Sequence, residues 1–345
     1  MAQHFFSFVV ALVALVTAMS QPAAFAQPRD YDAEIEDAIS AAKRAAGFEH
    51  LGLLNRLCVL PPSAGPRTSD TVPGYVTDPS TAPPRDRWYA DAAQVFDDLY
   101  WLGGSIHSAW LLTTAAGHIL IDTEFPYNSG VLILEGMRKF GFDPGDIRYI
   151  IISHAHGDHI GGVQIVQEAS RATVVMGEAD WDLVQRFPNR YAAMTPDRSN
   201  GIEVSEPMEL RLGERVVHVY PTPGHTDGTL SYVFTAHDFD RPVVVAYSGG
   251  TAFNFQTDRP DPGIPNLERY IASQEMFARS AAEAGATVLL SNHSEFDNAH
   301  NKSRMIAGRG FGPNPFVSSA DSVQGYFDAM TNCARAKIIG LERQR

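Results

Sequence analysis

Four side chains that can bind a metal ion lie within six consecutive positions: His154, His156, Asp158 and His159. Imidazole nitrogens and carboxylate oxygens are the usual protein ligands of zinc, and close spacing lets a single turn supply several of them. A lone histidine is more often solvated or packed in a core than bound to a metal. Crowding of this kind predicts a metal site.

Two further histidines occupy similar places in the chain. His225 lies in a turn rich in proline and glycine at residues 221–228, and His293 lies shortly after the apolar run of residues 287–290. Each would be weak evidence alone. Because the chain also contains the first segment, both are predicted to be metal ligands.

The first segment lies between two elements that can hold it in place. Residues 149–152 form a short apolar stretch typical of a buried strand, and Ile160-Gly161-Gly162 opens an expected helix. Sites at the carboxyl ends of strands are common in proteins that layer helices on a sheet. We therefore expect the histidines to lie at that edge of a sheet.

The rest of the chain alternates between the two kinds of element, which favours an α/β layered domain. Helices are expected at residues 31–46, 131–140, 162–169, 178–185 and 267–284, and residues 188–201 are expected to be loop. Strands are expected at residues 108–114, 118–122, 149–152, 173–176, 208–212, 216–221, 229–234, 243–247 and 287–290.

The composition is that of a globular protein. Of 345 residues, 44% are hydrophobic and 19% are charged, and the formal net charge is −13. An acidic surface repels phosphate backbones, so we expect no nucleic-acid partner. The sequence does not indicate an oligomeric state.

The amino-terminal region predicts export. Residues 5–19 form an apolar run, and Ala24-Phe25-Ala26 resembles a cleavage site, so we expect a signal peptide at residues 1–26 and a periplasmic or secreted protein. The alternative is an uncleaved membrane anchor. After cleavage no segment is long and apolar enough for stable membrane insertion.

Behind the expected signal peptide, residues 27–87 are expected to hold one helix followed by a Pro-rich arm, and the main domain to span residues 88–345. The two cysteines, Cys58 and Cys333, can form one disulfide in an oxidising compartment. The alternative is two separate buried thiols.

The three histidine segments resemble those of the metallo-β-lactamase superfamily, over roughly residues 88–340. The resemblance implies an αββα sandwich, two β-sheets packed together with helices outside. It implies two zinc ions per chain, one held by His154, His156 and His225, the other by Asp158, His159 and His293. It also implies that Asp122, at the end of an early strand, orients ligands of the turn.

The resemblance extends to one branch of that superfamily. Many branches carry a bridging aspartate where this chain has residues 247–251, Tyr-Ser-Gly-Gly-Thr, and one subclass of metallo-β-lactamases carries a cysteine. The chain has neither, and in this it resembles the third subclass. The stretch Pro313-Asn314-Pro315-Phe316-Val317 before a final helix is similar to that subclass too.

The resemblance implies a hydrolase in which two zinc ions activate a shared water that opens a cyclic amide, the ring of a β-lactam antibiotic. Asp158 would bind metal and orient the water. The alternatives are hydrolysis of a lactone, ester or xenobiotic, and a non-catalytic zinc-binding protein. Substrate contacts are expected from Trp101, His107, Thr251, Phe253 and Asn254.

Overall fold

A computed structural model describes Met1 and residues 29–59, 70–253 and 263–345. Tyr31–Arg345 forms one compact unit. Residues 2–26 of the expected signal peptide lie outside the described part of the chain, as does Asn254. Within the described ranges, no helix has both the length and the apolar character that a bilayer crossing requires.

The first of two β-sheets has seven strands in chain order, from β1 to β7. Pairing is antiparallel from β1 to β4 and parallel from β4 to β7. The strands are β1 (Ala93–Phe96), β2 (Leu99–Trp101), β3 (Trp110–Thr114), β4 (Gly117–Ile121), β5 (Ile147–Ile151), β6 (Thr173–Gly177) and β7 (Gly201–Val204).

The second sheet has five strands in the order β12-β11-β10-β9-β8. All its pairs are antiparallel except β11 with β12, which run parallel. The strands are β8 (Met208–Leu212), β9 (Arg215–Pro221), β10 (Leu230–Asp238), β11 (Arg241–Ser248) and β12 (Val288–Ser291).

Alternation along the strands shows how the sheets are layered. In β4, Ile119 and Ile121 join the core between the two sheets, whereas Leu120 packs into a second core with helices. In β10, Phe234 belongs to the central core and Val233 to a third core under other helices. Successive side chains of a strand point to opposite faces. Each sheet is therefore buried on both faces, and the αββα sandwich expected from the sequence is confirmed.

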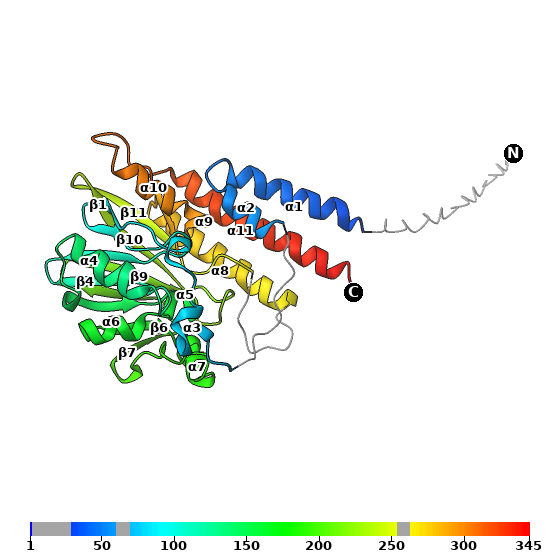
Figure 1. The fold of residues 1–345 in the computed structure, drawn as a ribbon. Helices are drawn as coiled ribbons and strands as arrows, with labels where there is room; N and C mark the ends of the chain where they lie inside the picture. The colour runs from blue at the N-terminus through cyan, green and yellow to red at the C-terminus, as the bar shows by residue number, and fades with distance from the viewer. Residues whose placement is uncertain (2–28, 60–69, 254–262) are drawn as a thin grey trace. The chain divides into compact units, whose positions relative to one another are not determined.

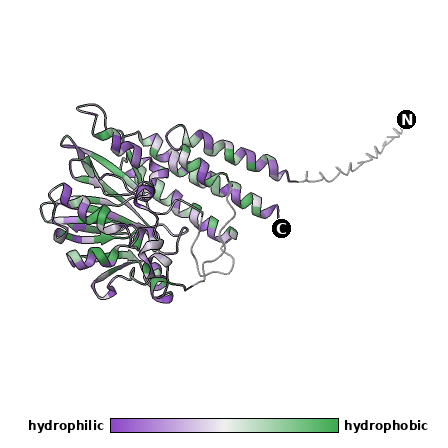
Figure 2. Ribbon diagram, in the orientation of Figure 1, coloured by the Kyte–Doolittle hydropathy of each residue, from purple (hydrophilic) through white to green (hydrophobic). Residues whose placement is uncertain are grey.

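Helices cover the two outer faces (Figure 1). The seven-stranded sheet packs against α4 (Gly136–Lys139), α6 (Val163–Ser170) and α7 (Glu178–Arg186). The five-stranded sheet packs against α8 (Gly263–Glu283) and α11 (Ala320–Glu342). In Figure 2 the strands are mostly green, while the helices alternate between green and purple, as expected of elements with one face in water.

The amino-terminal helices extend this outer layer. Helix α1 (Tyr31–Ala46) has the predicted bounds and lies along α11 (Figure 1). The contact is close, because a Cβ atom on Gly325 would lie 2.3 Å from the carbonyl oxygen of Ala45. Helix α2 (Leu51–Leu57) ends beside Cys58, which forms a disulfide with Cys333 of α11. The predicted disulfide is confirmed.

Several short elements were not expected. The Pro-rich arm, in which no helix was expected, contains α3 (Gly74–Thr77) and 3₁₀ turns at Pro79–Thr81 and Arg85–Arg87. Strands β1, β2 and β7 were not expected; each has only three or four residues, too few for a clear alternating pattern. The helix expected at 131–140 begins with a π-helical segment, Gly130–Glu135.

Candidate metal centre

The residues predicted to bind metal meet at one end of the sandwich. Strand β5 ends at Ile151, and the chain then turns through the first two histidines into the short helix α5 (Gly157–Ile160), which carries Asp158 and His159. His225 lies in the loop between β9 and β10, and His293 follows β12. These strands end at the same edges of the two sheets, so their loops converge.

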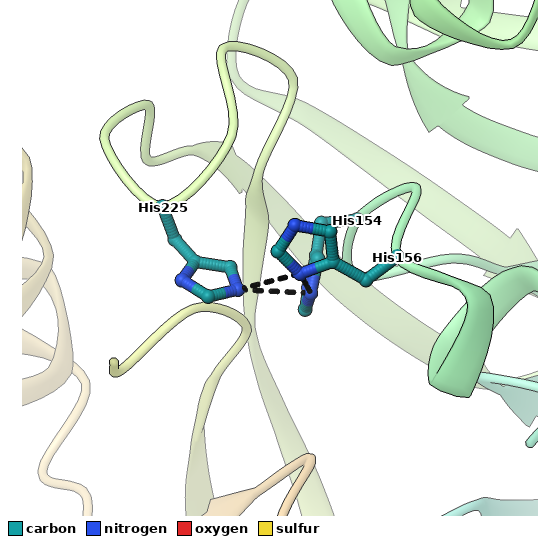
Figure 3. A group of neighbouring side chains, drawn as sticks. All are labelled: His154, His156 and His225. Atoms are coloured by element: carbon teal, nitrogen blue, oxygen red, sulfur yellow. Dashed lines mark hydrogen bonds between the residues drawn. The ribbon is translucent and has the colours of Figure 1, made fainter. Parts of the chain in front are cut away.

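Three histidines form the first cluster (Figure 3). His154 Nε2 lies 2.9 Å from His156 Nδ1, and His225 Nε2 lies 3.1 Å and 2.9 Å from those two atoms. All three side chains are buried. A tetrahedral zinc site with Zn–N bonds of about 2.0 Å has nitrogens roughly 3.3 Å apart, so the spacing fits.

The other ring nitrogens show which way the lone pairs point. His154 Nδ1 donates to the carbonyl oxygen of Gly249 at 2.8 Å, and His225 Nδ1 donates to that of Ala252 at 2.7 Å. With these protons placed by the hydrogen-bond network, both Nε2 atoms turn lone pairs toward the cluster centre. Lone pairs this close repel one another unless a cation lies between them, so the donor set fits a metal ion.

Protonation would not relieve this repulsion at neutral pH. Burial lowers the pKa of His225 to about 4, and burial together with the neighbouring histidines holds the pKa of His154 well below its usual value. The rings are therefore neutral, which is the form that binds metal.

A second cluster lies beside the first, with the rings of His154 and His159 4.4 Å apart. His159 Nε2 lies 3.1 Å from His293 Nε2, and Asp158 Oδ2 lies 3.2 Å from each of these atoms. His107 joins this cluster, with its Nε2 3.4 Å from Asp158 Oδ2. One carboxylate oxygen and several imidazole nitrogens thus converge, a donor set that suits zinc.

Charge in the second cluster is shared between acids and one histidine. Burial alone would lower the pKa of His159, but the carboxylates of Asp158 and Asp122 raise it to about 10. Burial alone would raise the pKa of Asp158, but His159 and its neighbours hold it well below its usual range. A bound cation at this point would take the place of the His159 proton.

Asp122 holds the turn that carries the metal ligands in place. Its carboxylate accepts hydrogen bonds from the Ser153 backbone N–H at 2.6 Å, the Ser153 hydroxyl at 2.7 Å and the Tyr247 hydroxyl at 3.0 Å. Its Oδ2 also lies 3.1 Å from His159 Nδ1. Asp122 has a positive φ of 60°, a conformation in which Asp is tolerated better than most residues. These contacts match the orienting role that the resemblance implies.

Sequence reasoning missed two residues that hold the loops together. The buried carboxylate of Asp180 accepts hydrogen bonds from the Ala155 and Gly228 backbone N–H groups, at 2.7 Å and 3.1 Å, so it joins the two loops of the first cluster. The amide of Asn292 donates to Gly249 O at 2.8 Å, beside His154. Asp180 lies in a helical segment with the pattern of an exposed acid, and nothing in its spacing indicated burial.

The predicted substrate contacts need correction. Trp101 is fully buried and donates to Ser108 Oγ at 3.0 Å, so it is a core residue. Thr251 is buried, with its hydroxyl 2.8 Å from that of Tyr326. Phe253 packs against Tyr270 in the core under α8. Of the described residues predicted for this role, His107 alone reaches the donor clusters.

Aromatic side chains stand next to the second cluster instead. Phe125 packs edge-on against His107 at 5.2 Å and stacks on Tyr127 at 5.0 Å, and Tyr75 lies 5.4 Å from Tyr127. Burial and the nearby Asp158 carboxylate raise the pKa of Tyr75 to about 12. We call Tyr75, Phe125 and Tyr127 the aromatic wall. All three are half-buried, so they can still meet a ligand.

A family model described as the metallo-beta-lactamase superfamily matches residues 102–284, which include every predicted metal ligand except His293. The chain belongs to the metallo-beta-lactamase superfamily. It is a metal-dependent hydrolase of that superfamily, with a three-histidine site at His154, His156 and His225.

Solved structures of this superfamily share the fold. BJP-1, a subclass B3 metallo-beta-lactamase of Bradyrhizobium japonicum, is 23% identical, with a TM-score of 0.59 over 74% of this chain and 93% of that one. SMB-1, a metallo-beta-lactamase, is 20% identical, with a TM-score of 0.62 over 73% of this chain and 97% of that one. At such identity the likeness shows the fold alone.

Curated relatives of this superfamily have other activities. An N-acyl homoserine lactonase from a Bacillus species is 25% identical over 177 residues, which are 45% of this chain and 68% of the relative. A hydroxyacylglutathione hydrolase from Acidiphilium cryptum is 26% identical over 185 residues, 54% of this chain and 63% of the relative. The chain spans about two thirds of the length of these relatives.

Proposed function

We propose that this protein is a two-zinc hydrolase that opens a cyclic amide, with a β-lactam ring as the substrate. The observation that carries the proposal is the pair of donor clusters side by side, with no carboxylate supplied by the end of β11. Two zinc ions bound there would lower the pKa of a water molecule and polarise a carbonyl oxygen.

Glycines at the end of β11 support this choice of branch. A Cβ atom on Gly249 would lie 1.7 Å from the carbonyl oxygen of Leu230, and one on Gly250 would lie 2.6 Å from His225 Cβ. No side chain fits at either position, so neither residue can be replaced by the bridging aspartate that many other branches carry. Gly249 contributes its carbonyl oxygen to His154 instead.

The residues around the clusters have separate tasks. Asp158 offers a carboxylate that stays ionised, and it can accept a hydrogen bond from the attacking water and hold that water in line with the substrate carbonyl. Asp122 and Asp180 hold the two ligand-bearing turns rigid. The aromatic wall offers a partly apolar surface on which the substrate ring can pack, excluding bulk water on that side.

Hydrolysis of a lactone is the second candidate. It is favoured by the similarity to an N-acyl homoserine lactonase. The same donor clusters would serve, because a lactone carbonyl and a lactam carbonyl present the same reacting atoms. The two candidates differ in the leaving group, an oxygen or a nitrogen.

We also propose that the protein is exported. The Cys58–Cys333 disulfide supports this, since such bonds persist in oxidising compartments. Amino-terminal sequencing of the protein from cell fractions tests it. A periplasmic or secreted chain that begins at Gln27 supports the proposal, and a cytoplasmic chain that retains Met1 contradicts it.

The test of substrate is a panel assay on the purified chain from Gln27 onward, loaded with zinc. A chromogenic cephalosporin and a carbapenem represent lactams, an N-acyl homoserine lactone represents lactones, and a hydroxyacyl thioester represents the third activity seen among relatives. Turnover of the lactams that a chelator abolishes supports the proposal. Two bound zinc ions with turnover only of the lactone or thioester would overturn it.

A further inference from the structure

We propose that His107 is a fourth protein ligand of the second metal site, so that this site is formed by Asp158, His159, His293 and His107. The inference rests on the two-metal site proposed above and extends its ligand set. His107 comes from the loop between β2 and β3, which supplies none of the other ligands.

The backbone delivers His107 to the cluster. His107 and His293 face each other across an isolated antiparallel bridge, flanked by hydrogen bonds from Ser108 N to Asn292 O at 2.9 Å and from Ser294 N to Ile106 O at 2.7 Å. The facing pair itself exchanges no hydrogen bond. In such a pair the side chains lie on the same face and closer together than in a hydrogen-bonded pair. The imidazole of His107 is thus placed beside that of a metal ligand.

Side-chain geometry points the same way. The donor atoms of His107, Asp158 and His293 all lie within 4.8 Å of one another. The rings of His107 and His293 are 4.8 Å apart and nearly perpendicular, and His107 Nε2 lies 3.4 Å from Asp158 Oδ2. These three side chains have similar partial exposure, 19%, 19% and 20%. All three side chains therefore line the same opening to solvent, and His107 is not an exposed residue outside a closed site.

The loop that carries His107 is held before any metal binds. Gly104 N donates to His107 O at 2.9 Å and to the buried carboxylate of Glu124 at 3.2 Å. A Cβ atom on Gly103 would lie 2.7 Å from His107 O, so the turn requires glycine there. Phe125 packs edge-on against the imidazole. A ligand placed in advance loses little freedom on binding, which strengthens metal affinity.

A fourth donor changes what the site can do. Three protein ligands leave a zinc ion dependent on water to complete its shell, whereas four fill a tetrahedral shell, and zinc can expand to five ligands when substrate arrives. The second site would therefore hold its ion more firmly than a three-ligand site. At limiting zinc it would stay filled longer than it does without His107.

The test compares zinc binding by four purified proteins, each stripped of metal and titrated in competition with a chromophoric chelator. They are the wild type, H107A, H107Q and H218A. H107Q keeps an N–H donor in place of the imidazole, so it separates metal binding from a hydrogen bond to Asp158. H218A removes a partly exposed histidine from β9 and serves as the matched control.

We expect wild type and H218A to bind two ions with the same two affinities. H107A and H107Q should keep one affinity and lose at least about ten-fold in the other, the scale seen when even an outer partner of a ligand is removed. Unchanged affinities in H107A, or wild-type affinities in H107Q, would overturn the inference. Wild type that binds one ion overturns both proposals. A weakened ion in H107A without turnover of any substrate by wild type overturns the proposed function alone.

Discussion

Histidines and acids gather at both ends of the sandwich, but they are paired differently. At the end remote from the metal clusters, Asp98 accepts hydrogen bonds from the Arg215 guanidinium, from His237 Nδ1 at 2.7 Å and from His237 N at 3.0 Å. Arg215 also donates to the carbonyl oxygen of Thr235. Every charge in this remote cluster has a partner within the protein.

At the metal end, ring nitrogens that carry lone pairs face one another. His154 Nε2 and His225 Nε2 are 3.1 Å apart, and each ring donates its Nδ1–H to a backbone carbonyl oxygen, which leaves a lone pair on each Nε2. The positive charge that would complete this arrangement does not come from an arginine, as it does beside Asp98. Residue types therefore do not distinguish a metal site from an ion-pair cluster. The direction of the lone pairs does.

The largest effect should follow from Asp158→Ala. Activity should fall at least about a thousand-fold, roughly 4 kcal/mol in transition-state stabilisation, because the ionised carboxylate beside His159 and His293 is lost. Steady-state kinetics measure the loss, and circular dichroism checks the fold. Asp146→Ala, which removes an exposed carboxylate, is the matched control and should keep full activity. Unchanged turnover in the Asp158 variant would contradict the assigned role.

Metal removal should destabilise the folded protein, because the stabilisation that the bound ions give to the folded state is lost. A ligand present at a thousand times its Kd stabilises the folded state by about 4 kcal/mol, so chelation should lower the free energy of unfolding by that order. Denaturant unfolding with and without chelator measures it. A variant with His154 and His156 both changed to Ala lacks the first site and keeps only the second, so chelation should destabilise it less. Equal responses in the two proteins would show that the chelator acts elsewhere.

The remote cluster should affect stability and leave activity unchanged. Asp98→Asn leaves the Arg215 guanidinium, which is 9% exposed, without its carboxylate. Breaking a buried ion pair in this way costs about 3 kcal/mol. Urea denaturation measures the loss, and substrate turnover should match that of wild type. A variant with full stability but reduced activity would reverse the assignment of the two ends.

The same variant gives a pH test. Burial acts to raise the pKa of Asp98, but hydrogen bonds from Arg215 and His237 hold it below its usual value. A lowered folded pKa means that the stabilisation is present above the unfolded pKa of about 4 and is lost as pH falls through the folded pKa. The stability gap between wild type and Asp98→Asn should thus be constant near neutrality and shrink in acid. A gap that widens in acid would contradict this.

The smallest of these effects should come from the disulfide. Replacing Cys58 and Cys333 with Ser should cost about 2 kcal/mol of stability, the low end of the range for loss of a native disulfide, because α1 and α2 still pack against α11 without the bond. Helix α2 also packs closely against Glu295, two residues after the predicted metal ligand His293: a Cβ atom on Gly52 would lie 1.9 Å from the carbonyl oxygen of Glu295. Thermal unfolding measures the loss, and zinc titration should show a weaker second site. If neither the thermal stability nor the zinc affinity changed, α2 would keep its place without the disulfide, which would contradict this prediction.

The sequence predicted the parts of this molecule that depend on local pattern. Three imidazoles and a carboxylate in one turn identified the metal site, and apolar alternation placed most strands of both sheets. The helix at Tyr31–Ala46 matched because its spacing and terminal Gly47 are both local signals. The Cys58–Cys333 bond was expected because the chain has two cysteines and its amino-terminal region predicts export.

Contacts between distant segments could not be predicted in this way. His107 reaches the second cluster through a bridge to His293, and no pattern around residue 107 indicates that pairing. Asp180 resembles a surface acid until the β9–β10 loop folds over it. Trp101, Thr251 and Phe253 were expected to face the substrate because of their place in the chain, but core packing turns them away. Tyr75 of the aromatic wall was missed because it comes from the arm, far in sequence from Tyr127 against which it packs.

The most direct test of the central claim is the zinc content of the purified chain from Gln27 onward, measured together with its hydrolysis of a chromogenic cephalosporin with and without chelator. Our account predicts two zinc ions per chain and turnover that chelation abolishes and zinc restores. A chain that binds no zinc, or turnover that survives complete removal of metal, would contradict it.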